Sequence, residues 1–302
     1  MLQFLQSLPS PIAQGLLWGI MAIGVYITYR ILDLADLTVD GSLATGGAVL
    51  VVLTTSGVNI YLSLIVAFLV GCVAGFVTGI LHTKFGIPAI LAGILTQLAL
   101  YSVNLRIMSG RANTPISWRN YDLIVSSRTT VLPKTIVVSV IFVAVIIALL
   151  YWFFGTEYGR TVRATGCNPA MARANGININ TRKIFGLTLS NGIVALSGGL
   201  LAQFSGNADI NMGRGAIVIG LAAVIIGEVV FGKIFVNFAL RLVAVAIGGI
   251  IYYVVIAAVL KLGLNTNDLK LLTALVVALF LGIPYWKNTV APKKVKAGAK
   301  NA

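Results

Sequence analysis

Three aspartates follow the first long apolar stretch of the chain, at a spacing that suits a buried polar site. The cluster and the glycines after it are Asp33, Asp36, Asp40, Gly41, Gly46 and Gly47. Carboxylates beside apolar segments of this kind are costly in a membrane and usually face protein or water. The glycines favour an interrupted helix whose unwound end lines a cavity. The alternative is an ordinary polar loop on the cytoplasmic side.

Other polar side chains lie within or next to apolar segments. Gln97, Asn104 and Asn191 can line a pathway or hydrogen-bond a neighbouring helix. A second group, which contains Gln203, Asp209, Asn211 and Arg214, favours an outer gate, a docking surface or a plain solvated turn. The candidates for a path or gate through a membrane are therefore Asp40, Gln97, Asn104, Asn191, Gln203, Asp209 and Asn211.

The residues needed for enzymatic chemistry are sparse. His82 is the one histidine, and its position beside Lys84 predicts an interfacial side chain. Cys72 and Cys167 lie in different contexts, which favours neither a metal site nor a disulfide framework. Residues 227–234 resemble a phosphate-binding loop but end in Ile234, where a Mg²⁺-binding hydroxyl is needed. We therefore expect no catalysis, no metal and no cofactor in this chain.

The composition is that of a membrane protein. Of 302 residues, 58% are hydrophobic and 10% are charged, whereas soluble domains have roughly 45–50% apolar and about 25% charged residues. The net charge of +14 comes from basic residues between apolar runs and in the C-terminal tail. They form no basic face with interleaved aromatics, which argues against nucleic-acid binding.

The apolar segments predict an all-α polytopic fold of about nine transmembrane or re-entrant helices in a single membrane domain, residues 1–302. The segments are 12–30, 42–58, 60–81, 87–107, 134–154, 184–205, 216–231, 237–260 and 268–286. With the basic tail 287–302 inside, 14 of the 22 Lys and Arg residues fall on the inner side. This bias predicts an outer N-terminus and a cytoplasmic C-terminus.

Two further patterns concern helix packing. Gly71, Gly75 and Gly79 form one smooth stripe on a helix, which predicts close contact with another helix. The triplets 35–37 and 208–210 both have Ala-Asp followed by Leu or Ile, and each opens a glycine-bearing apolar segment. The predicted topology puts them on opposite faces of the membrane, as an inverted repeat would. Chance similarity is the alternative.

The loop 155–183 predicts two short helices broken between Gly166 and Pro169. Asn168 and Pro169 suit an N-cap and a first helical position, and Gly176 suits a C-cap. The second helix is small and weakly apolar, which fits insertion into a groove of a partner. The alternative is an amphipathic helix on the membrane surface.

This loop carries a resemblance to a known family. Its pattern is Gly159-Arg160-x-x-Arg163-Ala164-x-Gly166-x-Asn168-x-x-Met171-Ala172-x-x-x-Gly176-Ile177. It resembles the cytoplasmic loop of ABC-importer permeases of the branched-chain amino acid and ribose permease superfamily. Residues 81–88, 91–96 and 101–108 are similar to the subgroup associated with tryptophan/tyrosine-type substrate-binding lipoproteins. The resemblance covers about Gly15 to Tyr285, with Cys167 as a departure at the break.

The resemblance implies a type II-like permease in a bacterial plasma membrane, dimerised around a central path. Two ATPase subunits would bind its cytoplasmic loops, ATP and Mg would sit on those subunits, and an external binding protein would deliver the solute. The matching coupling-loop residues are Arg163, Gly166, Asn168, Met171, Ala172 and Gly176. A small solute, with an aromatic amino acid favoured, would move by alternating access. The alternative is a secondary transporter driven by an ion gradient, which the aspartate cluster and the repeat favour.

Overall fold

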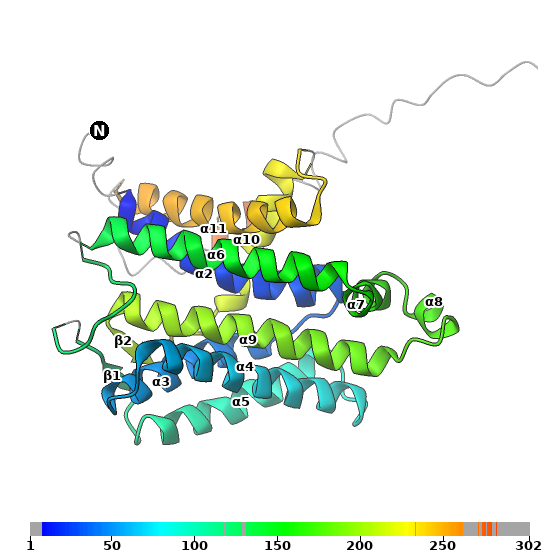
Figure 1. Ribbon diagram of the computed structural model, residues 1–302, viewed down its shortest axis with the longest axis horizontal. Helices are drawn as coiled ribbons and strands as arrows, with labels where there is room; N and C mark the ends of the chain where they lie inside the picture. The colour runs from blue at the N-terminus through cyan, green and yellow to red at the C-terminus, as the bar shows by residue number, and fades with distance from the viewer. Residues whose placement is uncertain are drawn as a thin grey trace, which may run out of the picture.

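The computed structural model describes residues 8–117, 119–128, 131–232 and 234–261, with a few positions between 271 and 282. This part of the chain is almost entirely helical (Figure 1). The helices are α2 Pro9–Tyr26 with its extension η1 Ile27–Ile31, α3 Thr38–Thr55, α4 Ile60–Thr83, α5 Ala89–Ile107, α6 Leu132–Gly155, α7 Glu157–Cys167, α8 Pro169–Ala174, α9 Ile179–Ser205, α10 Ala216–Phe231 and α11 Phe238–Lys261. The strands are β1 Asn113–Pro115 and β2 Asn207–Asp209.

The all-α polytopic fold predicted from the sequence is confirmed for the described residues. Seven helices are long and apolar enough to cross a membrane, and α10 is a shorter apolar helix. These eight elements match the first eight predicted segments within a few residues at each end. The predicted segment 268–286 lies largely outside the described residues, and the basic tail 287–302 lies entirely outside them.

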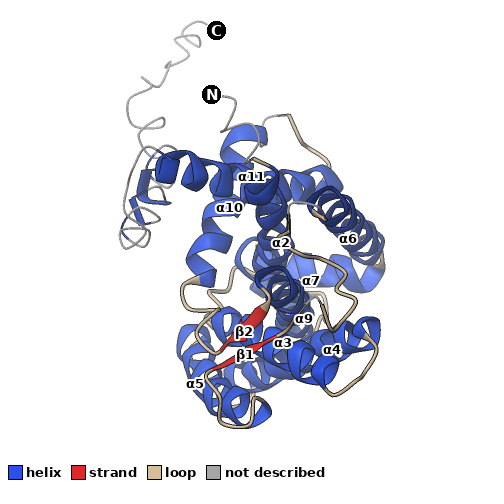
Figure 2. Cartoon of the chain, turned by 90° about the vertical axis from the view of Figure 1, so that its left-hand side faces the viewer, coloured by secondary structure: helices blue, strands red, loops and turns tan. Residues whose placement is uncertain are grey.

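The bundle has two distinct ends. Helices α7 and α8 project from one end, which we call the α8 end (Figure 1). The opposite end carries the two-stranded antiparallel sheet, in which Asn113 pairs with Asp209 and Pro115 with Asn207 (Figure 2). We call it the sheet end. Helix α9 connects the two, because it follows α8 directly and leads into β2.

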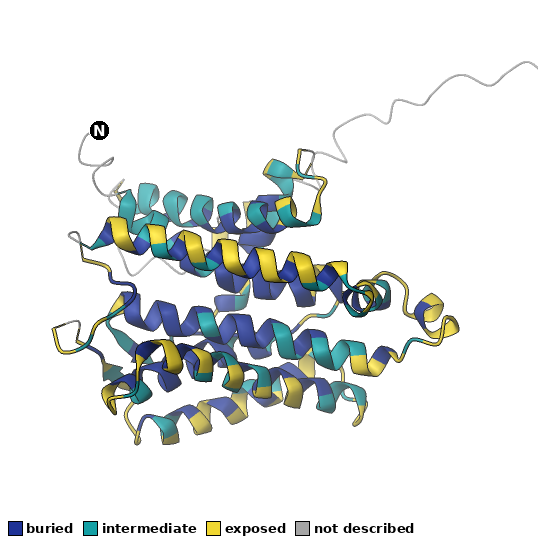
Figure 3. Cartoon of the chain, viewed as in Figure 1, coloured by how far each residue is buried: buried dark blue, intermediate teal, exposed yellow. Residues whose placement is uncertain are grey.

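Helix α9 is the buried centre of the bundle, packed against α2, α3 and α4 (Figure 3). The predicted glycine stripe makes one of these contacts. A Cβ at Gly71, Gly75 or Gly79 would meet α9 at Asn191, Leu187 or Ile184. The absence of a side chain therefore lets the backbones of α4 and α9 approach closely, and the packing interpretation of the stripe is confirmed.

The chain is interrupted between the first two long helices. It leaves η1 at Ile31, passes through residues 32–37 without regular helix, and begins α3 at Thr38. The predicted interruption is therefore present. The glycines do not form the unwound part, however, because Gly41, Gly46 and Gly47 lie inside α3. Gly46 instead allows α9 to pack closely against α3, since a Cβ at Gly46 would overlap the Ala195 carbonyl.

An inverted arrangement relates two groups of helices. Helix α3 follows α2 but packs parallel to α9, as the contacts Ser42–Asn191 and Gly46–Ala195 show. Helix α10 follows α9 but runs antiparallel to α11, which is itself antiparallel to α2. Since α2 and α9 are antiparallel to each other, α3 and α10 point in opposite directions. Opposite directions of this kind are what an inverted repeat would give, and the repeat that the two triplets suggested stays a prediction.

The two triplets share a local turn but not the predicted placement. In each, the aspartate Oδ1 accepts a hydrogen bond from the backbone N–H two residues later, Asp36 from Thr38 at 2.9 Å and Asp209 from Asn211 at 2.6 Å. The prediction that they lie on opposite faces was wrong for the first. Asp36 lies beside the middle of α9, because the interrupted segment folds back into the bundle.

Candidate functional site

The first aspartate of interest, Asp36, is a buried structural group. It is 2% exposed, and its Oδ2 accepts a hydrogen bond from Asn191 Nδ2 at 2.7 Å. The amide oxygen of Asn191 accepts one from Ser42 Oγ at 2.6 Å. Of the two predicted roles for Asn191, the structure shows hydrogen bonding between helices. The network ties the start of α3 to the centre of α9.

We expect Asn191→Ala to destabilise the protein. The substitution removes three side-chain hydrogen bonds, with Asp36, Ser42 and the Leu187 carbonyl. It leaves the Asp36 carboxylate short of a donor in a buried position, which costs roughly 2–4 kcal/mol. Thermal unfolding in detergent measures the loss. Asn120→Ala is the matched control, because Asn120 is an exposed loop residue. Equal melting temperatures for the two variants would contradict this role.

Asp40 holds the start of a second helix. Its Oδ2 accepts a hydrogen bond from the Gly215 N–H, and its Oδ1 accepts one from the Ile217 N–H, both at 2.9 Å. These groups lie at the N-terminus of α10, where a negative charge is favourable because the helix dipole is positive there. Gly213 packs against the Asp40 backbone, where a Cβ would overlap the carbonyl oxygen. Asp40 therefore joins α3 to α10.

Three of the predicted path residues line one cavity of about 390 Å³ between α3, α5 and the segment before α10. They are Asp40, Gln97 and Asn104, and the wall is completed by Gly41, Ala44, Leu98, Tyr101, Ile210 and Arg214. We call it the α3–α5 cavity. Asn104 is 1% exposed, and its Oδ1 has no hydrogen-bond partner among the described residues. A buried acceptor of this kind suits a donor group of a ligand.

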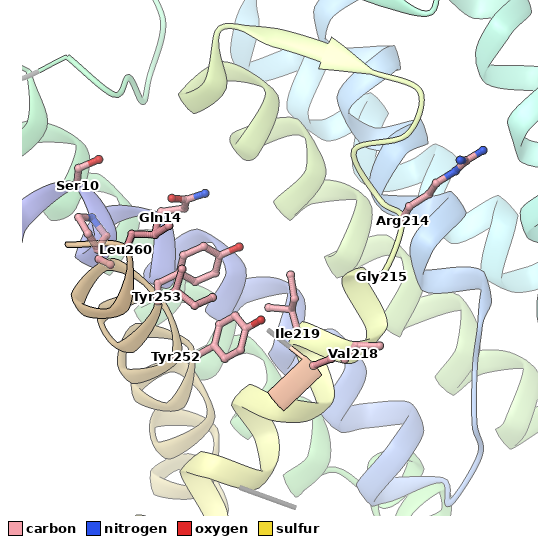
Figure 4. A pocket seen from close by; sticks show the side chains of 13 residues that line it. Ser10, Gln14, Arg214, Gly215, Val218, Ile219, Tyr252, Tyr253 and Leu260 are labelled. Atoms are coloured by element: carbon pink, nitrogen blue, oxygen red, sulfur yellow. The ribbon is translucent and has the colours of Figure 1, made fainter. Parts of the chain in front are cut away.

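Arg214 supplies the positive charge of the α3–α5 cavity. Sequence reasoning placed it in the outer polar group but not with Gln97 and Asn104. Its guanidinium forms no ion pair or side-chain hydrogen bond within the described residues. Arg214 also lines a second cavity, of about 720 Å³, together with Tyr252 and Tyr253, and Figure 4 shows its side chain extending away from the two tyrosines. Arg214 is thus a cation available to an anionic group.

The remaining path candidates do not line the α3–α5 cavity. Gln203 is buried at the sheet end, where its Oε1 accepts a hydrogen bond from the Ile124 N–H at 3.0 Å. Asp209 belongs to β2, and Asn211 is exposed in the turn that follows. These three residues shape the turn at the sheet end and its attachment to the bundle.

The predicted coupling loop forms the two short helices expected of it. Helix α7 ends at Cys167, and Asn168 caps α8 by accepting a hydrogen bond from the Met171 N–H at 3.0 Å. Gly176 has a φ of +75°, which a glycine adopts without strain. Met171 is 48% exposed, whereas Ala172 is fully buried. The remaining residues of α8 are exposed as well, and Met171 is the large apolar side chain among them.

The other coupling-loop candidates attach α7 to the bundle. A Cβ at Gly166 would overlap the Ile31 carbonyl, so only glycine allows α7 to pack this closely on η1. The guanidinium of Arg163 lies 4.9 Å from the centroid of the Phe238 ring at the start of α11. A cation over an aromatic face is attractive. The loop thus has an anchored half, α7, and an exposed half, α8.

Comparison with known proteins gives the family. The profile of the branched-chain amino acid transport system permease component matches residues 10–286. The chain is 42% identical, over 90% of its length and 89% of the relative's, to a protein named tyrosine transport system permease protein from Clostridioides difficile. It is 28% identical, over 60% of its length and 55% of the relative's, to ribose import permease protein RbsC from Haemophilus influenzae. No solved structure gives a significant match.

The chain therefore belongs to the family of branched-chain amino acid transport system permease components, and the resemblance seen in the sequence is confirmed. It is a multi-pass membrane protein of the ABC-importer permease superfamily. Members of this family are transport permease subunits.

Proposed function

We propose that this chain is the transmembrane subunit of an ATP-driven importer for an amino acid, with aromatic amino acids favoured. The observation that carries the proposal is the 42% identity, over nine-tenths of the chain, to a protein named as a tyrosine transport permease. Its partners would be a second copy of the chain, two ATPase subunits that hold ATP and Mg, and an external binding protein. The chain itself would carry out no catalysis and hold no cofactor.

The α3–α5 cavity is the proposed part of the solute path. It has a cation in Arg214, an unpartnered acceptor in Asn104 and an aromatic ring in Tyr101. An amino acid offers a carboxylate, an ammonium group and a side chain, so these three groups match its chemistry. Weak contacts suffice here, because the binding protein would supply the affinity.

Alternating access would be driven through the two halves of the coupling loop, the exposed helix α8 and the anchored helix α7. Met171 on α8 would enter a groove of the ATPase, and α7 would transmit the movement to η1 and α11, which it contacts through Gly166 and Arg163. ATP must favour one conformation over the other for the path to switch. In this arrangement the α8 end and the C-terminus face the cytoplasm, consistent with the basic residues there.

The ion-gradient alternative has less support. The proton- or sodium-binding group it would need is Asp40, and that carboxylate already accepts two backbone hydrogen bonds at the start of α10. Ion exchange at Asp40 would break the contact between α3 and α10. Asp36 and Asp40 thus have structural uses that require no ion.

The proposal is tested by pull-down of the tagged chain from gently solubilised membranes, followed by uptake into vesicles. We expect one ATPase and a binding lipoprotein to copurify, and tyrosine to be taken up only with ATP. Competition by tryptophan, leucine and ribose then defines the solute. Uptake by the purified chain alone, or its collapse by an ionophore while ATP is maintained, would contradict the importer assignment.

Arg214→Gln is expected to lower uptake at subsaturating solute about tenfold, because a bidentate contact with the carboxylate is lost. Arg214→Lys should recover only part of the rate, since an ammonium lacks the planar fork. The measurement is initial uptake in vesicles that contain the complete complex. Arg111→Gln is the control, because Arg111 is exposed and does not line the cavity. Unchanged uptake in Arg214→Gln would remove this residue from the path.

A further inference from the structure

Arginines gather at the α8 end around two adjoining cavities that have no part in the proposed path. The first, about 370 Å³, is lined by Arg30, Arg163 and Arg241 together with Tyr26 and Ile31. The second, about 690 Å³, is lined by Arg160 and Arg163 with Trp152 among its apolar residues. Arg163, Val236 and Phe238 line both. We call the pair the arginine cleft.

The arginine cleft has an excess of positive charge. No Asp or Glu is among the described residues that line either cavity. Arg30 forms an ion pair with Glu228, with Nε 2.9 Å from Oε1. Arg160, Arg163 and Arg241 form no ion pair within the described part of the chain. Arg163 lines both cavities and lies over the Phe238 ring, while Arg241 lines the first and Arg160 the second. Positive charges that share a cleft without an opposite charge repel, so an anion there is favourable.

An apolar surface leads directly into the cleft. Exposed side chains recur every three or four residues along one face of α6, at Val137, Ile141, Val145, Leu149 and Trp152. This face is visible along the front of α6 in Figure 3. Trp152 is 71% exposed and lines the larger cavity. A ligand with a long hydrocarbon chain can therefore lie on α6 while its charged end reaches the arginines.

We propose that the arginine cleft binds an anionic phospholipid, with its phosphate between Arg160, Arg163 and Arg241 and an acyl chain along α6. Guanidinium groups recognise phosphate oxygens through paired hydrogen bonds. Basic pockets between helices at the cytoplasmic side of a membrane suit anionic head groups. The charge selects the head group, and the α6 face selects a lipid over a free anion.

Such a lipid would connect parts of the protein that otherwise meet over a small contact. Arg160 and Arg163 belong to α7, Arg241 belongs to α11, and Arg30 lies in η1. A phosphate held by all of them would fix α7 against the ends of these helices. The anchoring of α7 would then depend on the lipid composition of the membrane.

The test uses the full chain in phosphatidylcholine vesicles that contain brominated phosphatidylglycerol, whose bromines quench nearby tryptophan fluorescence. The signal of Trp152 is the difference between the native chain and Trp152→Phe. We expect brominated phosphatidylglycerol to quench it at about tenfold lower mole fraction than brominated phosphatidylcholine. This preference should disappear in the double variant Arg160→Gln with Arg241→Gln. It should persist in Lys84→Gln, which removes an exposed basic charge from the same end outside the cleft.

Each other outcome overturns the proposal in a distinct way. Equal quenching by the two lipids shows that the cleft does not select charge. Loss of the preference in Lys84→Gln as well assigns it to general surface charge. Full competition by inorganic phosphate or by glycerophosphoglycerol assigns the cleft to a free anion. Loss of the preference once the ATPase is bound assigns it to an acidic protein surface. None of these readouts requires transport, and all but the last can be made without the proposed ATPase partner, so failure of the lipid proposal and failure of the proposed function are distinguishable.

Discussion

Met171→Asp is expected to reduce ATP-driven uptake to background while the melting temperature of the chain stays unchanged. Met171 is 48% exposed on α8, so an aspartate there meets water in the isolated chain and costs little stability. In the complex it would place a charge in the apolar groove of the ATPase. Loss of a central interface contact commonly costs 2 kcal/mol or more, which weakens binding about 30-fold.

The measurement is ATPase copurification together with uptake in vesicles. Met171→Leu is the control, because it keeps an apolar side chain of similar size and should retain both activities. Ala172→Asp is a poor probe, although Ala172 belongs to the same sequence pattern as Met171. Ala172 is fully buried, so the substitution disturbs the packing of α8 as well. Normal uptake with Met171→Asp would show that α8 is not the coupling element.

Gly46→Val is expected to prevent stable folding of the bundle. Its first added atom would overlap the Ala195 carbonyl, and the β-branch adds two more methyl groups. Gly198 makes the reciprocal contact, where a Cβ would overlap the Leu43 carbonyl. Because both sides of the contact are backbone, the helices must separate, and we expect a loss of about 3 kcal/mol or more. Detaching α3 from α9 also strains the hydrogen bonds of Asp36.

Size-exclusion chromatography and thermal unfolding in detergent detect the loss. Gly155→Ala is the matched control, since Gly155 ends α6 and has open space where a Cβ would be. This variant should behave as the native chain does. A monodisperse Gly46→Val protein with a native melting temperature would mean that α3 and α9 are less tightly packed than the structure indicates.

The coupling loop was predictable because its signals are local. The Asn168–Pro169 pair, the break after Gly166 and the cap at Gly176 each act within a few residues, and all three appear where the sequence placed them. The sequence did not separate the roles of Met171 and Ala172. Adjacent residues on a short helix face different surroundings, and those surroundings come from the rest of the bundle.

The roles of the polar path candidates, by contrast, could not be predicted from local signals. Gln97, Asn104 and Asn191 look alike in sequence, as amides in apolar segments. The fold puts two of them in the wall of the α3–α5 cavity and uses the third to bind Asp36. Burial alone does not distinguish them, because Asn104 and Asn191 are both buried. What differs is the hydrogen-bond partner: Asn191 has Asp36 within reach, whereas the Asn104 Oδ1 has no partner among the described residues.

The sequence by itself determined the helical membrane fold, the approximate bounds of the apolar segments and the form of the coupling loop. These follow from hydrophobic length, periodicity and capping, which are properties of neighbouring residues. Only the tertiary structure decided that Asp36 meets Asn191, 155 residues away, and that Asp40 holds a helix that begins some 175 residues later. It also gathered the arginines of three separate elements into one cleft. Contacts over such distances depend on how helices pack, and packing is a property of the whole bundle.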